Sequence, residues 1–369
     1  MGRSRENHFV PKFYLKYFSE DGKRINLFNF ARGKAIRGVS IRQQCARHNL
    51  YDFAPGLEEA FAKLEGETAK VLAKVEADCA PPAAGSADWI ALASFIIFQK
   101  LRTTRAGHKS NATTDYLSKL ILEGKPEVAG IDLNDIEIGD AYPVAIPLSV
   151  AGEMIPAVLD LDMHLFVNAT RWEFITADDP VVAHNQYCEG VTNRGVAGFS
   201  CRGLQLFWPV SPDHLLLLSD RDVYKVGRAD QGIPVTNVSS RSDIAQLNAL
   251  QILNAHENVY YRREGANNQI EMQCVGLLKA RPRTRVVFIE TESLPDPVDG
   301  GESALLHQYE PLLPWQLKVS AIRIRKAAAS VPLHTRANMY RGAGRVREPP
   351  VGGRDMAPGR YRVRRTTRK

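Results

Sequence analysis

The sequence of 369 residues lacks the signatures of several common enzyme classes. It contains no Gly-x-Ser-x-Gly nucleophile elbow, no phosphate-binding loop, no Gly-x-Gly-x-x-Gly fingerprint and no His-Glu-x-x-His zinc motif. These motifs carry the nucleophile, the phosphate contacts or the metal of their classes. Their absence argues against nucleotide-dependent, hydride-transferring and zinc-protease functions.

Cysteines and long apolar segments are also scarce. The five cysteines are odd in number and form no Cys-x-x-Cys pair, which indicates free thiols in a reducing compartment. The longest strongly apolar stretch, Trp89–Phe98, is about half of the ~20 residues that a membrane-spanning helix needs. The charged N-terminus is not followed by the apolar segment of a secretory signal. We therefore expect a cytoplasmic protein that does not contact a membrane.

The net charge of +7 is unevenly distributed along the chain. Residues 323–369 contain 14 Lys or Arg and 2 Asp or Glu, a net charge of +12. Residues 1–322 contain 34 basic and 39 acidic residues, a net charge of −5. The C-terminal segment is rich in Gly, Pro and Arg and has little to bury, which is typical of disorder. We expect one globular domain over 1–322, with a candidate sub-domain seam near 124–140, followed by a disordered arginine-rich tail over 323–369.

Hydrophobic periodicity predicts helices and strands without regular βα alternation. A hairpin is expected near 24–30 and 34–39, followed by a helical segment over about 57–122. Helices are predicted at 57–77, 89–101, 113–122, 150–159 and 243–256, and later strands at 164–168, 172–176, 203–210, 214–218 and 259–261. This pattern favours an α+β fold, with the helical segment inserted between the hairpin and an antiparallel or mixed sheet.

The N-terminal motif contains two candidate catalytic residues. His8 and Tyr14, on either side of Pro11, carry groups that transfer protons or orient a substrate by hydrogen bonds. The alternative is a turn fixed by Pro11, with His8 as a structural histidine.

A second candidate site lies in Phe174-Ile175-Thr176-Ala177-Asp178-Asp179-Pro180-Val181. An apolar strand that ends in two carboxylates suggests Asp178 as a catalytic acid or base, and Asp178 with Asp179 as ligands of Mg²⁺. The alternative is a turn, in which an Asp before Pro closes the strand by bonding its own backbone.

A third candidate site is the end of the apolar helix, Gln99-Lys100-Leu101-Arg102-Thr103-Thr104-Arg105. Arg102 would neutralise negative charge during catalysis, and Arg105 and Gln99 would bind substrate. The alternative is that these cations complement the helix dipole, each by about 0.3–1 kcal/mol.

Together these motifs resemble a bacterial family catalogued as domain of unknown function four-two-three-eight. The resemblance spans about residues 7–262 and brings no established activity, fold or cofactor. The sequence differs from the usual family pattern at Ala177, where Ser is usual, at Asp179, where Asn is usual, and at Thr104, where Pro is usual. The residues that carry it occur in this order: His8, Pro11, Tyr14, Leu15, Phe18, Tyr51, Gln99, Arg102, Thr103, Thr176, Asp178, Pro180, Val181, Pro209, Ser211, Pro212 and Asn248.

Two functional hypotheses follow. The first is a Mg²⁺-assisted or acid–base hydrolase, such as a nuclease or phosphoesterase, with a toxin or defence effector as its biological context. It requires His8, Arg102 and Asp178 to meet in one solvent-reaching pocket. The second is a non-catalytic binding domain, in which these residues hold the fold and the basic tail contacts nucleic acid or an acidic partner.

Overall fold

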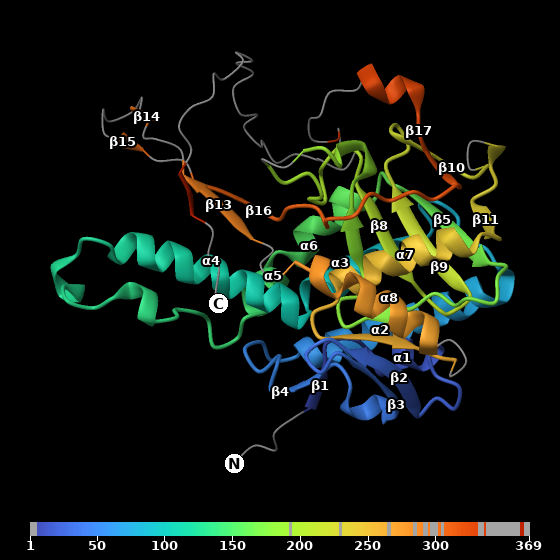
Figure 1. Cartoon of the computed structure of the whole chain (residues 1–369), viewed down its shortest axis with the longest axis horizontal. Coiled ribbons are helices and arrows are strands. Elements are labelled where there is room, and N and C mark those ends of the chain that lie inside the picture. The colour runs from blue at the N-terminus through green and yellow to red at the C-terminus, as the bar shows by residue number, and fades with distance from the viewer. Residues whose placement is uncertain are drawn as a thin grey trace.

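The computed structural model confirms an α+β fold (Figure 1). Its core is a five-stranded mixed sheet, a four-stranded antiparallel sheet and helices packed on both. Within the described part of the chain, no helix is both long and apolar enough to cross a membrane. The structure describes residues 6–191, 194–228, 231–263, 267–282, 286–290, 294–295, 302–303, 306–330, 336 and 362–364.

The five-stranded sheet lies between two helices and buries both of its faces. Side chains alternate along each strand, so Trp208 and Leu216 pack toward α3 (Ala87–Leu101), whereas Phe207 packs toward α7 (Arg241–Asn254). Its strand pairs are antiparallel except β11 with β5, which are parallel. In spatial order the strands are β11 (Val235–Val238), β5 (Asp162–Asn168), β9 (His214–Ser219), β8 (Gln205–Pro209) and β7 (Val182–His184).

The predicted N-terminal hairpin is confirmed and forms half of the second sheet. Ile252 of α7 and Ile270 of α8 (Asn267–Leu277) belong to the apolar cluster that this sheet contributes to. Helix α7 therefore contributes to the apolar clusters of both sheets. The strands, in spatial order, are β3 (Lys34–Ser40), β2 (Arg24–Asn29), β12 (Asn258–Tyr261) and β6 (Thr176–Ala177).

The helical segment follows the hairpin, as predicted, but its third helix starts earlier than expected. Helix α4 (Thr104–Leu122) begins directly after α3, because the side chain of Thr103 accepts a hydrogen bond from Ala106 N at 3.3 Å. The predicted helix at 150–159 is divided at Ile155, where a 3₁₀ turn that contains Pro156 begins. The other helices here are α2 (Leu57–Asp78), α5 (Ala145–Ser149) and α6 (Ala151–Met154).

The predicted strand at 172–176 is largely wrong. Only Thr176 and Ala177 pair with a neighbouring strand. The backbone before them is bonded by a side chain instead, because Asn248 of α7 accepts from Ile175 N at 3.1 Å and donates to Glu173 O at 2.9 Å. A side-chain amide thus replaces the strand partner that an extended segment would otherwise need.

Several short elements had no prediction. They include a first helix, α1 (Lys12–Tyr17), and a strand pair formed by β1 (Glu6–His8) and β4 (Ala46–His48). They also include α5, α8, β7 and β11, and the strands β10 (Tyr224–Val226), β17 (Ile322–Ile324), β13 (Val287–Glu290), β16 (Leu306–Tyr309), β18 (Arg362–Arg364), β14 (Leu294–Pro295) and β15 (Glu302–Ser303).

The ordered body extends past the predicted boundary between 322 and 323. Strand β17 crosses this boundary and pairs with β10. Arg336 is buried, and its guanidinium donates to Asp160 Oδ2 at 3.1 Å and to Phe199 O at 2.6 Å. Burying an arginine requires such partners, so Arg336 anchors the chain to the body at this point. Most of the predicted disordered tail, 337–361 and 365–369, lies outside the described residues.

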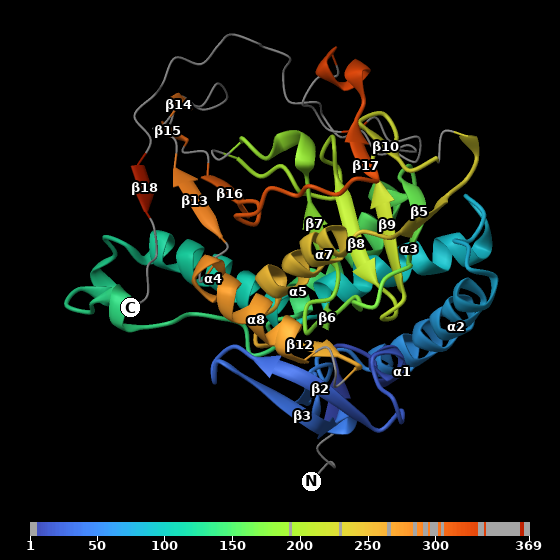
Figure 2. The same cartoon turned by 45° about the vertical axis from the view of Figure 1, so that its right-hand side comes forward.

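Residues 108–143 form a projecting arm, visible as the α4 extension in Figures 1 and 2. It consists of the outer part of α4 and a returning limb that contains the candidate seam 124–140. None of these 36 residues is buried. The limb is hydrogen-bonded along the helix instead, because Asp140 N donates to Asn111 Oδ1 at 3.0 Å and Ile138 N donates to Asp115 Oδ1 at 2.8 Å.

Candidate functional site

Asp178, a predicted catalytic and metal-binding residue, is only 4% exposed. Its Oδ1 accepts from His256 N at 2.7 Å, and its Oδ2 accepts from Glu257 N at 2.6 Å and Asn258 N at 3.0 Å. The first two N–H groups belong to the loop between α7 and β12, and the third belongs to the first residue of β12. The carboxylate therefore ties the end of β6 to that loop, and both of its oxygens have protein donors.

Asp179 points to a different set of partners. Its carboxylate lies 3.2 Å from Lys100 Nζ and 3.7 Å from Arg105 Nε. Adjacent side chains on extended backbone face opposite sides, so the two carboxylates do not converge on one position. Among the described residues, no group of three or more His, Cys, Asp and Glu is arranged to hold a metal ion. The donor set does not fit the Mg²⁺ site predicted from Asp178 and Asp179.

Helix α7 locks the same segment with a row of side-chain amides. Asn248, Gln251 and Asn254 follow one another at three-residue steps and so lie along one side of the helix. Beyond the two bonds of Asn248, Gln251 Nε2 donates to Pro180 O at 2.9 Å and Asn254 Nδ2 donates to Asp179 O at 2.6 Å. The backbone over 173–180 is therefore held by the helix that covers it.

Arg102, a predicted catalytic residue, is 1% exposed and bonded within the protein. It donates to Gln99 Oε1 from Nε at 3.1 Å and from a terminal nitrogen at 2.8 Å, and to Glu65 Oε1 at 2.7 Å. Its guanidinium also lies 5.0 Å from the ring centroid of Phe61. Gln99 Nε2 in turn donates to Phe9 O at 2.9 Å. The predicted pair Gln99 and Arg102 thus connects α2 and α3 to the N-terminal segment.

Arg105, predicted to bind substrate, lies at the start of α4 and is buried. Besides its contact with Asp179, it donates to Ala255 O at 2.7 Å. That carbonyl follows the last residue of α7, so Arg105 complements the negative end of this helix. The interaction links α4 to the loop that also surrounds Asp178.

Tyr14 is fully enclosed between the two sheets. Its hydroxyl lies 2.6 Å from Thr176 Oγ1 and donates to Pro209 O at 2.5 Å. Its ring stacks on Trp208 with centroids 5.7 Å apart. Burial raises the pKa of Tyr14 far above its usual range. The hydroxyl therefore stays protonated at neutral pH and holds α1 against both sheets.

His8 is the one predicted catalytic residue that keeps partial solvent access. Its Nε2 lies 2.9 Å from Arg42 O, and burial lowers the pKa of its imidazole. A neutral ring that donates from Nε2 to the carbonyl satisfies this contact.

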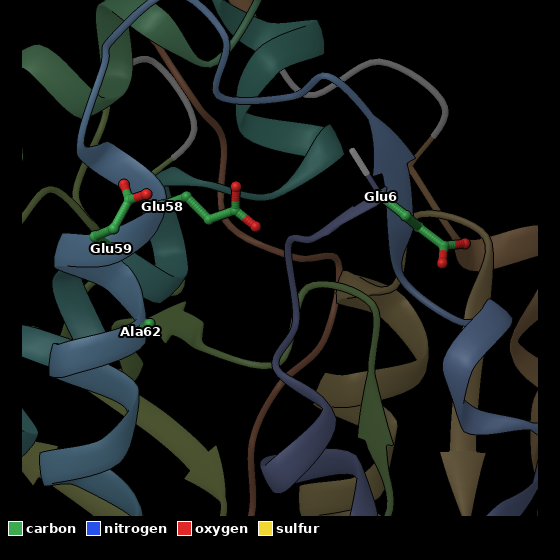
Figure 3. A pocket seen from close by; sticks show the side chains of 4 residues that line it. All are labelled: Glu6, Glu58, Glu59 and Ala62. Atoms are coloured by element: carbon green, nitrogen blue, oxygen red, sulfur yellow. The ribbon is translucent and has the colours of Figure 1, made fainter. Parts of the chain in front are cut away.

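Near His8, an open recess of about 520 Å³ lies between β1 and the start of α2. It is lined by Glu6, Glu58, Glu59 and Ala62. Figure 3 shows the Glu58 side chain reaching into the gap toward β1, whereas Glu59 lies on the helix and the Glu6 carboxylate points away. The carboxylates do not converge, and their charge disfavours a phosphate ligand.

The structure therefore divides the predicted site residues. Gln99 and Arg102 form one cluster with Glu65, while Asp178, Asp179 and Arg105 form another around the end of α7. Arg102 and Asp178 are buried, so they do not line a solvent-reaching pocket with His8. Sequence reasoning missed Glu65, Lys100 and the amides of α7 after Asn248. The available signal was the three-residue spacing of those amides within the largely apolar second half of the helix.

The fold and these contacts together define an α+β domain in which motif residues lie in two internal polar clusters. The chain belongs to the family described as Protein of unknown function (DUF4238), whose model matches residues 6–265. This confirms the resemblance predicted from the motifs, and the match contains every residue of both clusters. No curated protein and no solved structure matches the chain.

The stability of the fold should depend on pH because of the buried Glu173. Its carboxylate accepts hydrogen bonds from the backbone N–H groups of Arg262 and Arg263. Burial raises its pKa from 4.5 to about 7. A carboxyl group whose pKa is higher in the folded than in the unfolded protein stabilises the fold fully at a pH below its unfolded pKa. This contribution is lost as the pH rises through the folded pKa. Relative to Glu173→Gln, the wild type should lose up to about 3 kcal/mol between pH 4.5 and pH 8.

Urea unfolding of both proteins at pH 4.5 and pH 8 measures this difference. The burial of Asp178, which raises the pKa of that carboxyl to about 6, acts equally in both proteins and cancels. A gap between the two proteins that stays constant, or widens in the wild type's favour as pH rises, would contradict the account.

Proposed function

We propose that this domain is a non-catalytic binding domain whose arginine-rich C-terminal segment contacts nucleic acid or another polyanion. The observation that carries the proposal is the state of Asp178. Both oxygens of this central acid of the motif accept hydrogen bonds from three backbone N–H groups, and its side chain is buried, which supports a structural role. Buried polar residues bonded in this way specify a fold.

Charge supports the same proposal. Ten basic residues and two acidic ones follow Arg336, a net charge of +8, whereas the body is acidic. A basic segment binds polyanions without reading sequence, by releasing counterions from phosphates. The buried Arg336 would fix the point at which this segment leaves the body.

Deletion of residues 337–369 should therefore abolish nucleic-acid binding. With six to ten phosphate contacts, the intact protein should lose about 10³-fold in affinity for a single-stranded DNA 20-mer between 50 and 200 mM NaCl. Fluorescence anisotropy measures both effects. As matched controls, Arg341, Arg345, Arg347, Arg354 and Arg360 are changed together to Lys, which keeps binding, or to Gln, which weakens it. Unchanged binding by the truncated chain would refute the role of the segment.

Acid–base hydrolysis is the second candidate, and one observation favours it. His8 keeps partial solvent access and burial lowers the pKa of its imidazole, which suits a general base. Incubation of wild type, Asp178→Asn and His8→Gln with DNA and RNA in Mg²⁺ or Mn²⁺ separates the candidates. No cleavage by any of them supports the binding domain, whereas wild-type cleavage lost in a folded variant supports the hydrolase.

A further inference from the structure

The projecting arm, residues 108–143, has a defined backbone conformation but contains no buried residue. Side chains of α4 hold its two limbs together, because Asn111 and Asp115 accept hydrogen bonds from the backbone N–H groups of Asp140 and Ile138. At Gly139 the limb passes directly beside Asn111, since a Cβ there would lie 2.6 Å from Asn111 Nδ2. An exposed apolar surface on an element without a core of its own is typical of a binding site for another segment.

Apolar side chains are unusually exposed on this arm. Ile121 is 64% exposed and Ile131 is 54% exposed, on α4 and on the returning limb respectively. Leu117, Leu120 and Ile136 are also exposed. Single exposed apolar residues are ordinary, but several on one projecting element mark a contact surface.

The returning limb is strongly acidic. Residues 123–140 contain six Asp or Glu and one Lys, a net charge of −5. Glu127, Asp135 and Glu137 are all exposed. An acidic and apolar surface fits an occupant that is basic and apolar, and two such arms would repel each other.

The C-terminal segment of the chain has that composition. Residues 341–369 carry a net charge of +8, and their end alternates apolar and basic residues in Tyr361-Arg362-Val363-Arg364. Its described part, β18, pairs with β13, and Phe288 of β13 stacks on Tyr116 of the arm with ring centroids 4.2 Å apart.

We propose that the acidic arm is the docking surface for the arginine-rich segment 341–369 of the same chain. Docking withholds these arginines from nucleic acid, so the arm and a polyanion compete for one segment. The second statement rests on the proposed function, whereas the docking itself does not.

Limited trypsin digestion of the full-length protein tests the docking. The arm variant carries Glu127→Gln, Asp135→Asn and Glu137→Gln; the matched control carries Glu67→Gln, Asp78→Asn and Glu153→Gln, exposed acids elsewhere. At 50 mM NaCl, intact-mass analysis should show the C-terminal segment removed about fivefold faster from the arm variant, the effect of losing a few exposed ion pairs. The control should stay within about twofold of wild type, and 500 mM NaCl should remove the difference.

Equal digestion rates in all three proteins would overturn the docking. A wild-type digestion rate that depends on protein concentration would also overturn it, because the occupant of the arm would then be a second copy of the chain. Anisotropy with the DNA 20-mer tests the competition: the arm variant should bind about fivefold more tightly than the control. If trypsin digestion shows the protected segment but none of the proteins binds DNA, the proposed function is refuted and the docking stands. If the proteins bind DNA but are digested at equal rates, the docking is refuted and the proposed function stands.

Discussion

Asp178→Ala should lower the free energy of unfolding by about 3 kcal/mol, because it leaves the backbone N–H groups of residues 256–258 without their acceptor. An unsatisfied buried group costs about 1–3 kcal/mol, and the low end applies to these partly exposed residues. The loss is also limited because the wild-type carboxylate is itself costly to bury, as its raised pKa shows. Asp178→Asn keeps one acceptor oxygen and should lose about half as much.

Urea unfolding at pH 7, followed by circular dichroism, measures these losses. The exposed Asp78, near the end of α2, provides the control, and Asp78→Ala should change stability by less than about 0.5 kcal/mol. An Asp178→Ala protein as stable as wild type would show that the carboxylate does not hold the loop after α7.

Arg102→Leu is expected to have an effect of similar size, about 3 kcal/mol. Leucine can pack between Phe61 and Phe95, but it leaves the Gln99 carbonyl and the Glu65 carboxylate without their donor. Arg102→Lys should also be destabilising, because an ammonium group cannot form the paired bonds to Gln99 Oε1.

A double-mutant cycle isolates the ionic part of this effect. Glu65→Gln alone should cost little, since Glu65 is partly exposed, and the coupling energy with Arg102→Leu should be about 1 kcal/mol. Coupling indistinguishable from zero would mean that Arg102 stabilises the protein through Gln99 and its aromatic contacts, without a contribution from the ion pair with Glu65.

The sequence was most informative where one segment determines its own structure. The hairpin follows from alternating apolar residues and its turn, and α3 follows from a helix that is apolar almost all round. The bond between Gln99 and Arg102 also follows a local rule, since residues three apart on a helix are neighbours.

The remainder depends on contacts between distant segments. Asp178 bonds to backbone groups about 80 positions away, and backbone N–H donors leave no mark on the sequence around 256–258. The same limit explains the strand expected at 172–176, where the partner is the side chain of Asn248 rather than another strand. Composition places Arg336 in the predicted tail, because the residues near it in the sequence do not indicate its distant partners Asp160 and Phe199.

The most direct test of the account compares stability and binding in the same variants. Unfolding free energy and anisotropy with the DNA 20-mer are measured for wild type, Asp178→Ala and Arg102→Leu at 10 °C, where a circular dichroism spectrum confirms that each is folded. The account predicts that both variants lose about 3 kcal/mol of stability while the folded proteins bind DNA as wild type does. Variants with wild-type stability but lost binding or cleavage would contradict it, because the motif would then act on a ligand rather than on the fold.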